Sequence, residues 1–89
     1  MTEAVTDMVD AVISLIRSLA QDGDLPRDLA AASLGAETRL EQLGLDSLGK
    51  MHLLSAIDER LHIFIPDDAV HPEMTIGVLA NKVASKQRG

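Results

Sequence analysis

The chain reads LGLDSL from Leu43 to Leu48, and this stretch decides where its second helix begins. Gly44 marks a turn, and Asp46 and Ser47 are both residue types that cap the start of a helix. Apolar residues then recur at helical spacing, which predicts a helix that begins at Asp46 or Ser47 and runs to about Leu61. A serine hydroxyl is therefore expected at the start of a helix, directly after a turn.

Two further helices are predicted, one on each side of this stretch. The first is ended by Gly23 and Pro26, and the last begins after Thr75, a candidate N-cap. The apolar stripes are Val5, Met8, Val9, Val12, Ile16, Leu19 and Ala20 in the first helix, and Ile76, Leu79, Ala80 and Val83 in the last.

A long connection, from about Asp22 to Asp46, separates the first two helices. A loop of this length holds short structure of its own or a function, and Pro26 predicts the start of a short helix within it. Its apolar anchors are Leu34, Leu40, Leu43 and Leu45. After the second helix, residues 62–66 are expected to form an extended linker that buries Ile63 and Ile65, and residues 66–70 a helical turn.

These elements predict an all-α fold, a small bundle of three main helices plus one short helix, with a long first loop. Eighty-nine residues make one domain, expected to span residues 1–89 with its core at about 3–85 and a polar tail at 86–89. The chain has no cysteine and Phe64 is its one aromatic residue, so the core must be aliphatic.

Spacing along the second helix also predicts which side faces the core. The expected inner side consists of Leu48, Met51, Leu54, Ile57 and Leu61, and the expected outer side of Gly49, His52, Ala56 and Glu59. Met51 is accordingly expected to fill the core, while Leu48, at the edge of the apolar arc, is a candidate contact for a partner.

The net charge of −6 argues against nucleic-acid binding, which needs a basic surface. Acidic residues interrupt the amino-terminal apolar run, so no signal peptide is expected. No apolar stretch has the length of a membrane span. These features predict a free-standing cytoplasmic protein, with a monomer as the default.

Three interpretations of Ser47 differ in chemistry. It is an ordinary helix cap, a hydrolase nucleophile, or the attachment point of a phosphate-linked group, which the positive end of the helix dipole would stabilise. The nucleophile is disfavoured because the chain lacks the pattern G-x-S-x-G, and because His52 lies on a different face of the same helix. The other histidines, His62 and His71, are expected to be solvated, and Asp67 and Asp68 to be surface charges rather than metal ligands.

The LGLDSL stretch resembles the phosphopantetheine attachment motif of acyl carrier proteins. Thr38–Gln42 resembles the lead-in of that family, Ile57–Pro66 the end of its second helix, and Thr75–Ala80 the start of its last helix. Together these segments span about residues 38–84 in the family's order.

The resemblance implies the family's helical fold and a non-catalytic carrier. Ser47, flanked by Asp46 and Leu48, would be esterified by the 4′-phosphopantetheine of coenzyme A through a phosphopantetheinyl transferase. The thiol of the arm would hold acyl groups for a ketosynthase, an acyltransferase or other acyl-processing enzymes. No catalytic or metal-binding residue is expected.

The chain also departs from the fatty-acid carriers of this family. Residues 47–62 have no net charge, Gly49 and His52 stand where those carriers have acids, and Val78 stands where Asp is common. These differences favour polyketide or other specialised biosynthesis and a docking surface of Leu45, Leu48, Met51 and His52. The alternatives are a fatty-acid synthesis carrier and an unmodified helical interaction module.

Overall fold

The computed structural model describes the backbone of residues 2–87 and the side chains of residues 7–86. This part of the chain contains three α-helices, α1 (Thr2–Asp22), α2 (Ser47–Leu61) and α3 (Ile76–Gln87). Short 3₁₀ helices lie in the connections, namely η1 (Arg27–Ala30), η2 (Leu40–Leu43) and η3 (Asp67–Ala69). The all-α prediction is confirmed. The short helix expected at Pro26 is η1 and the expected turn at 66–70 is η3, whereas η2 was not predicted.

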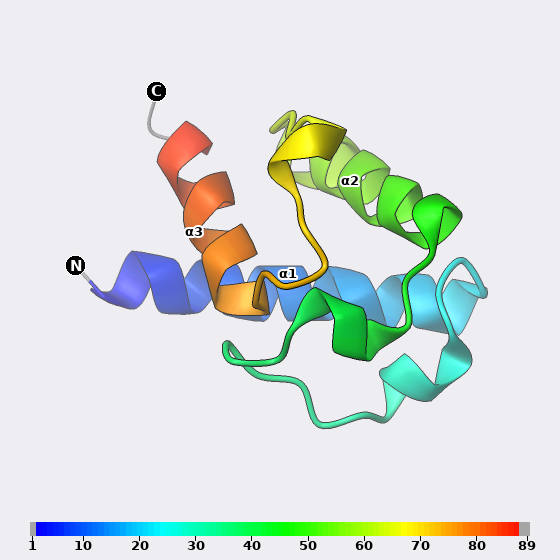
Figure 1. The fold of residues 1–89 in the computed structure, drawn as a ribbon. Coiled ribbons are helices and arrows are strands. Elements are labelled where there is room, and N and C mark those ends of the chain that lie inside the picture. Colours follow the sequence, from blue (N-terminus) through cyan, green and yellow to red (C-terminus); the bar gives the residue numbers. More distant parts are fainter. Residues whose placement is uncertain (1, 88–89) are drawn as a thin grey trace.

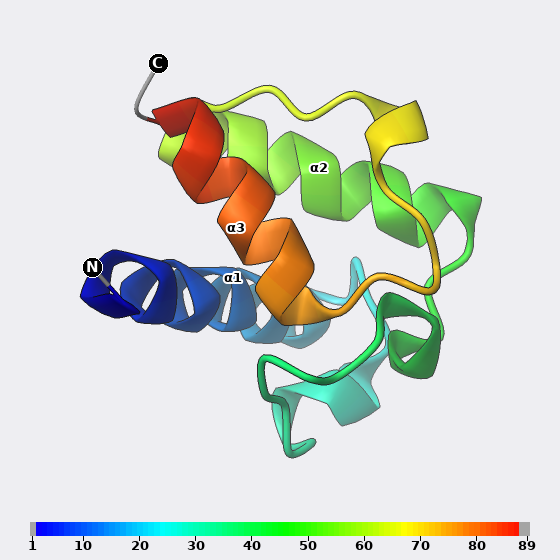
Figure 2. The same ribbon diagram turned by 60° about the vertical axis from the view of Figure 1, so that its left-hand side comes forward.

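The long helix α1 is the element on which the others pack (Figure 1). In the two ribbon views α3 crosses α1 steeply, and α2 lies on the same side of α1 as α3 (Figures 1 and 2). The predicted apolar stripes of α1 and α3 are buried, apart from Val5, whose side chain lies outside the described residues. Leu15 of α1 joins them in the core. The apolar stripes of α1 and α3 pack together because amphipathic helices gain stability by burying their apolar faces against each other.

In the view of Figure 1, much of the first loop lies below α1, whereas α2 and α3 lie above it. Leu40 and Leu43 are buried, and Leu34 and Leu45 are half-buried against the core, as expected for anchors. Arg17 of α1 adds a polar attachment, because its Nη1 donates to the carbonyl oxygens of Ala30 and Ala32, both at 3.1 Å. The loop is thus held by apolar and polar contacts.

The end of the first loop is bonded to the segment that precedes α3. Arg39 and Thr75 form an isolated antiparallel bridge. The Leu40 amide donates to the Met74 carbonyl and the Ile76 amide to the Thr38 carbonyl, both at 2.8 Å. The start of η2 is therefore fixed against the start of α3.

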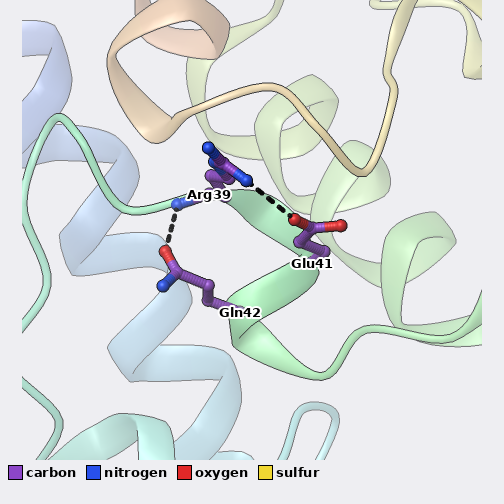
Figure 3. Close-up of polar contacts among 3 residues, drawn as sticks. All are labelled: Arg39, Glu41 and Gln42. Atoms are coloured by element: carbon purple, nitrogen blue, oxygen red, sulfur yellow. Dashed lines mark hydrogen bonds and ion pairs between the residues drawn. The ribbon is translucent and has the colours of Figure 1, made fainter.

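Side chains support η2 as well (Figure 3). The Arg39 amide donates to Oε1 of Gln42 at 2.8 Å, which satisfies a backbone donor at the start of this short helix. The Arg39 guanidinium pairs with Glu41 at 3.3 Å, an exposed contact that contributes little to stability.

The predicted inner face of α2 is wrong in part. Ile57 is fully buried and Leu54 and Leu61 are half-buried against the core, as expected. Leu48 and Met51 are 58% and 57% exposed, and Met51 does not fill the core. The buried residues of α2 are Gly49, Leu53, Ala56 and Ile57, so Gly49 and Ala56 face inward and not outward. Apolar residues surround α2 on more than one side, so periodicity alone did not select a face. The contacts with α1 and η3 select it instead.

The remaining connections follow the sequence predictions. Ile63 and Ile65 are buried in an extended segment after α2. Oγ1 of Thr75 accepts a hydrogen bond from the Val78 amide at 3.1 Å, which makes Thr75 the cap of α3. Among residues 2–87, no helix combines the length and apolar character required to cross a membrane.

Candidate functional site

Asp46, and not Ser47, caps α2. Oδ1 of Asp46 accepts a hydrogen bond from the Gly49 amide at 2.7 Å, and Asp46 has extended backbone angles. Ser47 is the first residue of the helix and is exposed. Within the described part of the chain, its hydroxyl makes no hydrogen bond with another residue. The structure therefore presents this hydroxyl to solvent at the positive end of a helix.

Two glycines shape the approach to Ser47. Gly44 ends η2 with φ of 71°, a left-handed conformation that favours glycine. Gly49 is buried, and a Cβ there would lie 3.3 Å from Cδ2 of Leu45 and 3.4 Å from Cδ2 of Leu25. The absence of a side chain at Gly49 lets the first loop pack directly on the first turn of α2.

A cleft of about 710 Å³ opens beside Ser47. Its walls come from η2, the first turns of α2 and the segment from η3 to Pro72. Residues that line it include Ser47, Lys50, Met51, Leu53, Val70 and His71. Most of these surfaces are apolar, so the cleft offers an extended group beside the Ser47 hydroxyl a largely apolar surface to lie against.

A smaller hollow of about 370 Å³ lies on the other side of the α2 start. Its walls are formed by residues 23–27 of the first loop and by residues 44–46 and 48–49. Leu48 lines this hollow and Met51 lines the larger cleft, while Leu45 and Asp46 line both. Ser47 thus stands on a ridge with apolar side chains on each side.

The expected docking residues differ in their freedom to contact a partner. The exposed side chains of Leu48 and Met51 and the half-buried Leu45 gather around the start of α2, and we call these three residues the apolar rim. His52 is half-buried, and its Nδ1 lies 3.0 Å from the carbonyl oxygen of Asp24. Its ring is therefore engaged with the first loop.

Groups needed for hydrolysis or metal binding are not assembled around Ser47 in the described residues. His71 is exposed and lines the same cleft as Ser47, yet no hydrogen bond joins its ring to the hydroxyl. His62 is exposed at the end of α2. Among the described side chains of residues 7–86, no group of three or more His, Cys, Asp or Glu is placed to hold a metal ion.

The sequence analysis missed Lys50, which lines the cleft three residues after Ser47. Its Nζ donates to the Val70 carbonyl oxygen at 3.2 Å and pairs with Oδ1 of Asp67 at 3.3 Å. The spacing of three residues places Ser47 and Lys50 on neighbouring positions of one helix surface. That spacing was the one signal available in the sequence, whereas the contact with η3 depends on tertiary structure.

Comparison with known proteins adds one finding. Residues 24–83 match the model of a protein family described as the phosphopantetheine attachment site. The match covers about two thirds of the chain and includes α2, nearly all of the first loop and every residue that lines the two hollows beside Ser47 except Gly23. No curated protein and no solved structure has significant similarity to the chain.

Proposed function

The chain belongs to the phosphopantetheine attachment-site family, and we propose that Ser47 is the residue to which it attaches the arm. Membership makes the chain a carrier protein with a covalent 4′-phosphopantetheine group. The observation that carries the assignment to Ser47 is its free, exposed hydroxyl at the start of α2. Asp46 supplies the helix cap, so modification of Ser47 removes no hydrogen bond that the fold requires.

The surroundings of Ser47 fit this group. The phosphodiester would be stabilised by the amide groups and dipole at the start of α2. The cleft of about 710 Å³ beside it has room for part of an extended chain. Among the flanking residues, Asp46 orients the first turn of the helix, and Leu48 adds apolar surface on the opposite side.

Attachment requires a separate enzyme, the phosphopantetheinyl transferase. The Ser47 oxygen forms a bond to the phosphorus that bears the pantetheine in coenzyme A. The bond from that phosphorus to the adenosine bisphosphate breaks, and a base of the transferase takes the hydroxyl proton. The carrier itself contributes a reachable hydroxyl and a rigid helix start, which is consistent with a non-catalytic role.

We infer that the carrier holds acyl intermediates as thioesters, because the arm ends in a thiol and the chain contains no cysteine. Its partners would be a ketosynthase, an acyltransferase or related acyl-processing enzymes in the cytoplasm, with residues 1–89 acting as one monomeric domain. The apolar rim would supply the docking contacts, with His52 at its edge holding the first loop.

The charge of α2 supports a polyketide or other specialised pathway over general fatty-acid synthesis. Lys50 and Arg60 balance Asp58 and Glu59, so the helix has no net charge. A neutral surface with exposed Leu48 and Met51 suits partners that bind largely through apolar contacts.

Intact-mass spectrometry tests the assignment. After incubation with coenzyme A and a broad-specificity phosphopantetheinyl transferase, the chain should gain the mass of one arm. Ser47→Ala should gain none, whereas Ser55→Ala, a change at an exposed serine of the same helix, should be modified like the original chain. Failure of the original chain with several transferases, or modification of Ser47→Ala, would overturn the assignment. If the chain were instead an unmodified helical interaction module, Ser47→Ala would bind its partner and function normally.

A further inference from the structure

Lys50 stands in the cleft beside Ser47 and connects its two walls. Its side chain extends from α2, is 27% exposed, and reaches Val70 and Asp67 on the opposite wall. Asp67 belongs to η3 and Val70 directly follows it, so the Lys50 side chain links η3 to α2. The Asp67 side chain is 70% exposed, and exposed ion pairs are weak because water screens them.

The charges that line this cleft are unequal. Glu41, Asp46 and Asp67 contribute carboxylates, and among the described residues Lys50 is the one lysine or arginine in the lining. A phosphodiester on Ser47 would add another negative charge at the mouth of the cleft. Charge in a partly apolar site is costly unless an opposite charge or hydrogen bonds compensate it.

Lys50 is within reach of such a group. Side chains three residues apart on a helix have Cβ atoms about 5–6 Å apart, and a lysine stem of four carbons spans a similar distance. The ammonium is a compact, mobile donor that suits a phosphate oxygen. Rotation of the Lys50 side chain would replace its contact with the solvent-screened carboxylate of Asp67 by a contact with the phosphodiester. The bond to Ser47 holds that phosphodiester nearby.

We propose that Lys50 binds the phosphodiester of the arm on Ser47 and gives up its ion pair with Asp67 when it does so. This inference rests on Ser47 as the attachment residue. Attachment of the arm then loosens the contact between α2 and η3, so the wall of the cleft that contains Val70 changes when the carrier is loaded.

Phosphorus NMR of the modified chain measures the contact directly. The ³¹P resonance of the phosphodiester should differ between the folded chain and the same chain unfolded in urea. In Lys50→Met, which keeps the apolar stem and removes the charge, most of that difference should be lost. Lys50→Arg should restore it, and Lys82→Met, at an exposed lysine of α3, should leave it unchanged.

Amide NMR spectra test whether Lys50 gives up its contact with Asp67 when the arm is attached. Attachment of the arm should shift the amide resonances of Asp67 and Val70 in the original chain but not in Lys50→Met. Native-like amide spectra before modification would establish that each variant is folded.

Mass spectrometry of the same samples separates the two proposals. Absence of the arm from the original chain would overturn the assignment of Ser47 and this inference with it. An arm on Ser47 with equal ³¹P shifts in the original chain and in folded Lys50→Met would overturn only the role of Lys50. A third outcome is that the ³¹P shift changes in Lys50→Met, but attachment of the arm does not shift the Asp67 and Val70 amides of the original chain. This result would overturn the proposal that Lys50 gives up its ion pair with Asp67.

Discussion

The carboxylate of Asp46 accepts a hydrogen bond from the Gly49 amide at 2.7 Å, and this contact leaves the adjacent hydroxyl of Ser47 free. Asp46 and Ser47 therefore have separate tasks, the first in starting α2 and the second in presenting an oxygen to solvent. Buried Gly49 makes the arrangement compact, because its lack of a side chain admits Leu45 and Leu25.

This division of tasks predicts that substitutions at Asp46 and Ser47 have unequal effects on stability. Asp46→Ala removes the cap and should lower the free energy of unfolding by about 1 kcal/mol. Ser47→Ala should change it by less than about 0.5 kcal/mol, as for other exposed positions without a structural contact. Urea denaturation of the unmodified chains measures both. Equal losses in the two variants would show that the serine shares the capping role.

The corrected face of α2 can be tested with two leucines of the same helix. Leu53 is fully buried, so Leu53→Ala should destabilise the chain by about 2–5 kcal/mol. Leu48 is 58% exposed, and Leu48→Ala should cost less than about 0.5 kcal/mol. Thermal unfolding of both variants provides the comparison. A larger loss for Leu48→Ala would restore the face expected from periodicity.

A close contact between α3 and the first loop makes Gly77 sensitive to substitution. A Cβ at Gly77 would lie 3.0 Å from the carbonyl oxygen of Ala36, which also accepts the Gly77 amide at 2.8 Å. Gly77→Ala should destabilise by about 1 kcal/mol or more, since overpacking outweighs the gain in helix propensity. The control Asn81→Ala, on the exposed side of α3, should be neutral or stabilising in chemical denaturation. Stabilisation by both changes would contradict the tight packing.

The hydrogen bonds from Arg17 to the first loop predict a local effect. Arg17→Met leaves the carbonyl oxygens of Ala30 and Ala32 without this donor, and should cost about 1–3 kcal/mol. Hydrogen exchange of the Ala31 amide should accelerate, because η1 loses its attachment to α1. Arg27→Met, at an exposed arginine of η1, is the matched control. Unchanged exchange in Arg17→Met would mean that apolar anchors alone hold the loop.

The neutral charge of α2 predicts weak salt dependence of docking. Binding of the modified chain to the proposed ketosynthase partner should change by less than about threefold between about 50 and 150 mM salt, because apolar contacts are not screened. Leu48→Ala and Met51→Ala should weaken the complex at both salt concentrations. Isothermal titration calorimetry provides the dissociation constants, and a tenfold loss on adding salt would indicate a largely electrostatic interface.

The second helix shows both the strength and the limit of sequence patterns. Asp46 and Ser47 predicted where α2 begins, and Leu61 predicted about where it ends, because capping residues and turns act locally. The inward side could not be read in the same way, since Leu48, Met51, Leu53 and Leu54 surround the helix. Leu53 became the buried member only through packing in the bundle.

The cleft beside Ser47 could not be predicted from local sequence patterns either. Ser47 and Lys50 are close in the sequence, but Asp67 and Val70 reach the cleft from the opposite wall through the linker after α2. No periodicity relates residues of separate elements, so their contact appears only when the elements are packed.

By itself, the sequence determined the three α-helices, about where they begin and end, and the placement of a serine at the start of α2, because hydrogen bonding, capping and turn formation depend on neighbouring residues. Tertiary structure alone decided that Gly49 and Leu53 face inward, that Leu48 and Met51 stay exposed, and that Lys50 spans a cleft to η3. The physical reason is that burial and ion pairing depend on which surfaces meet in space, and several apolar surfaces of α2 were available to be covered.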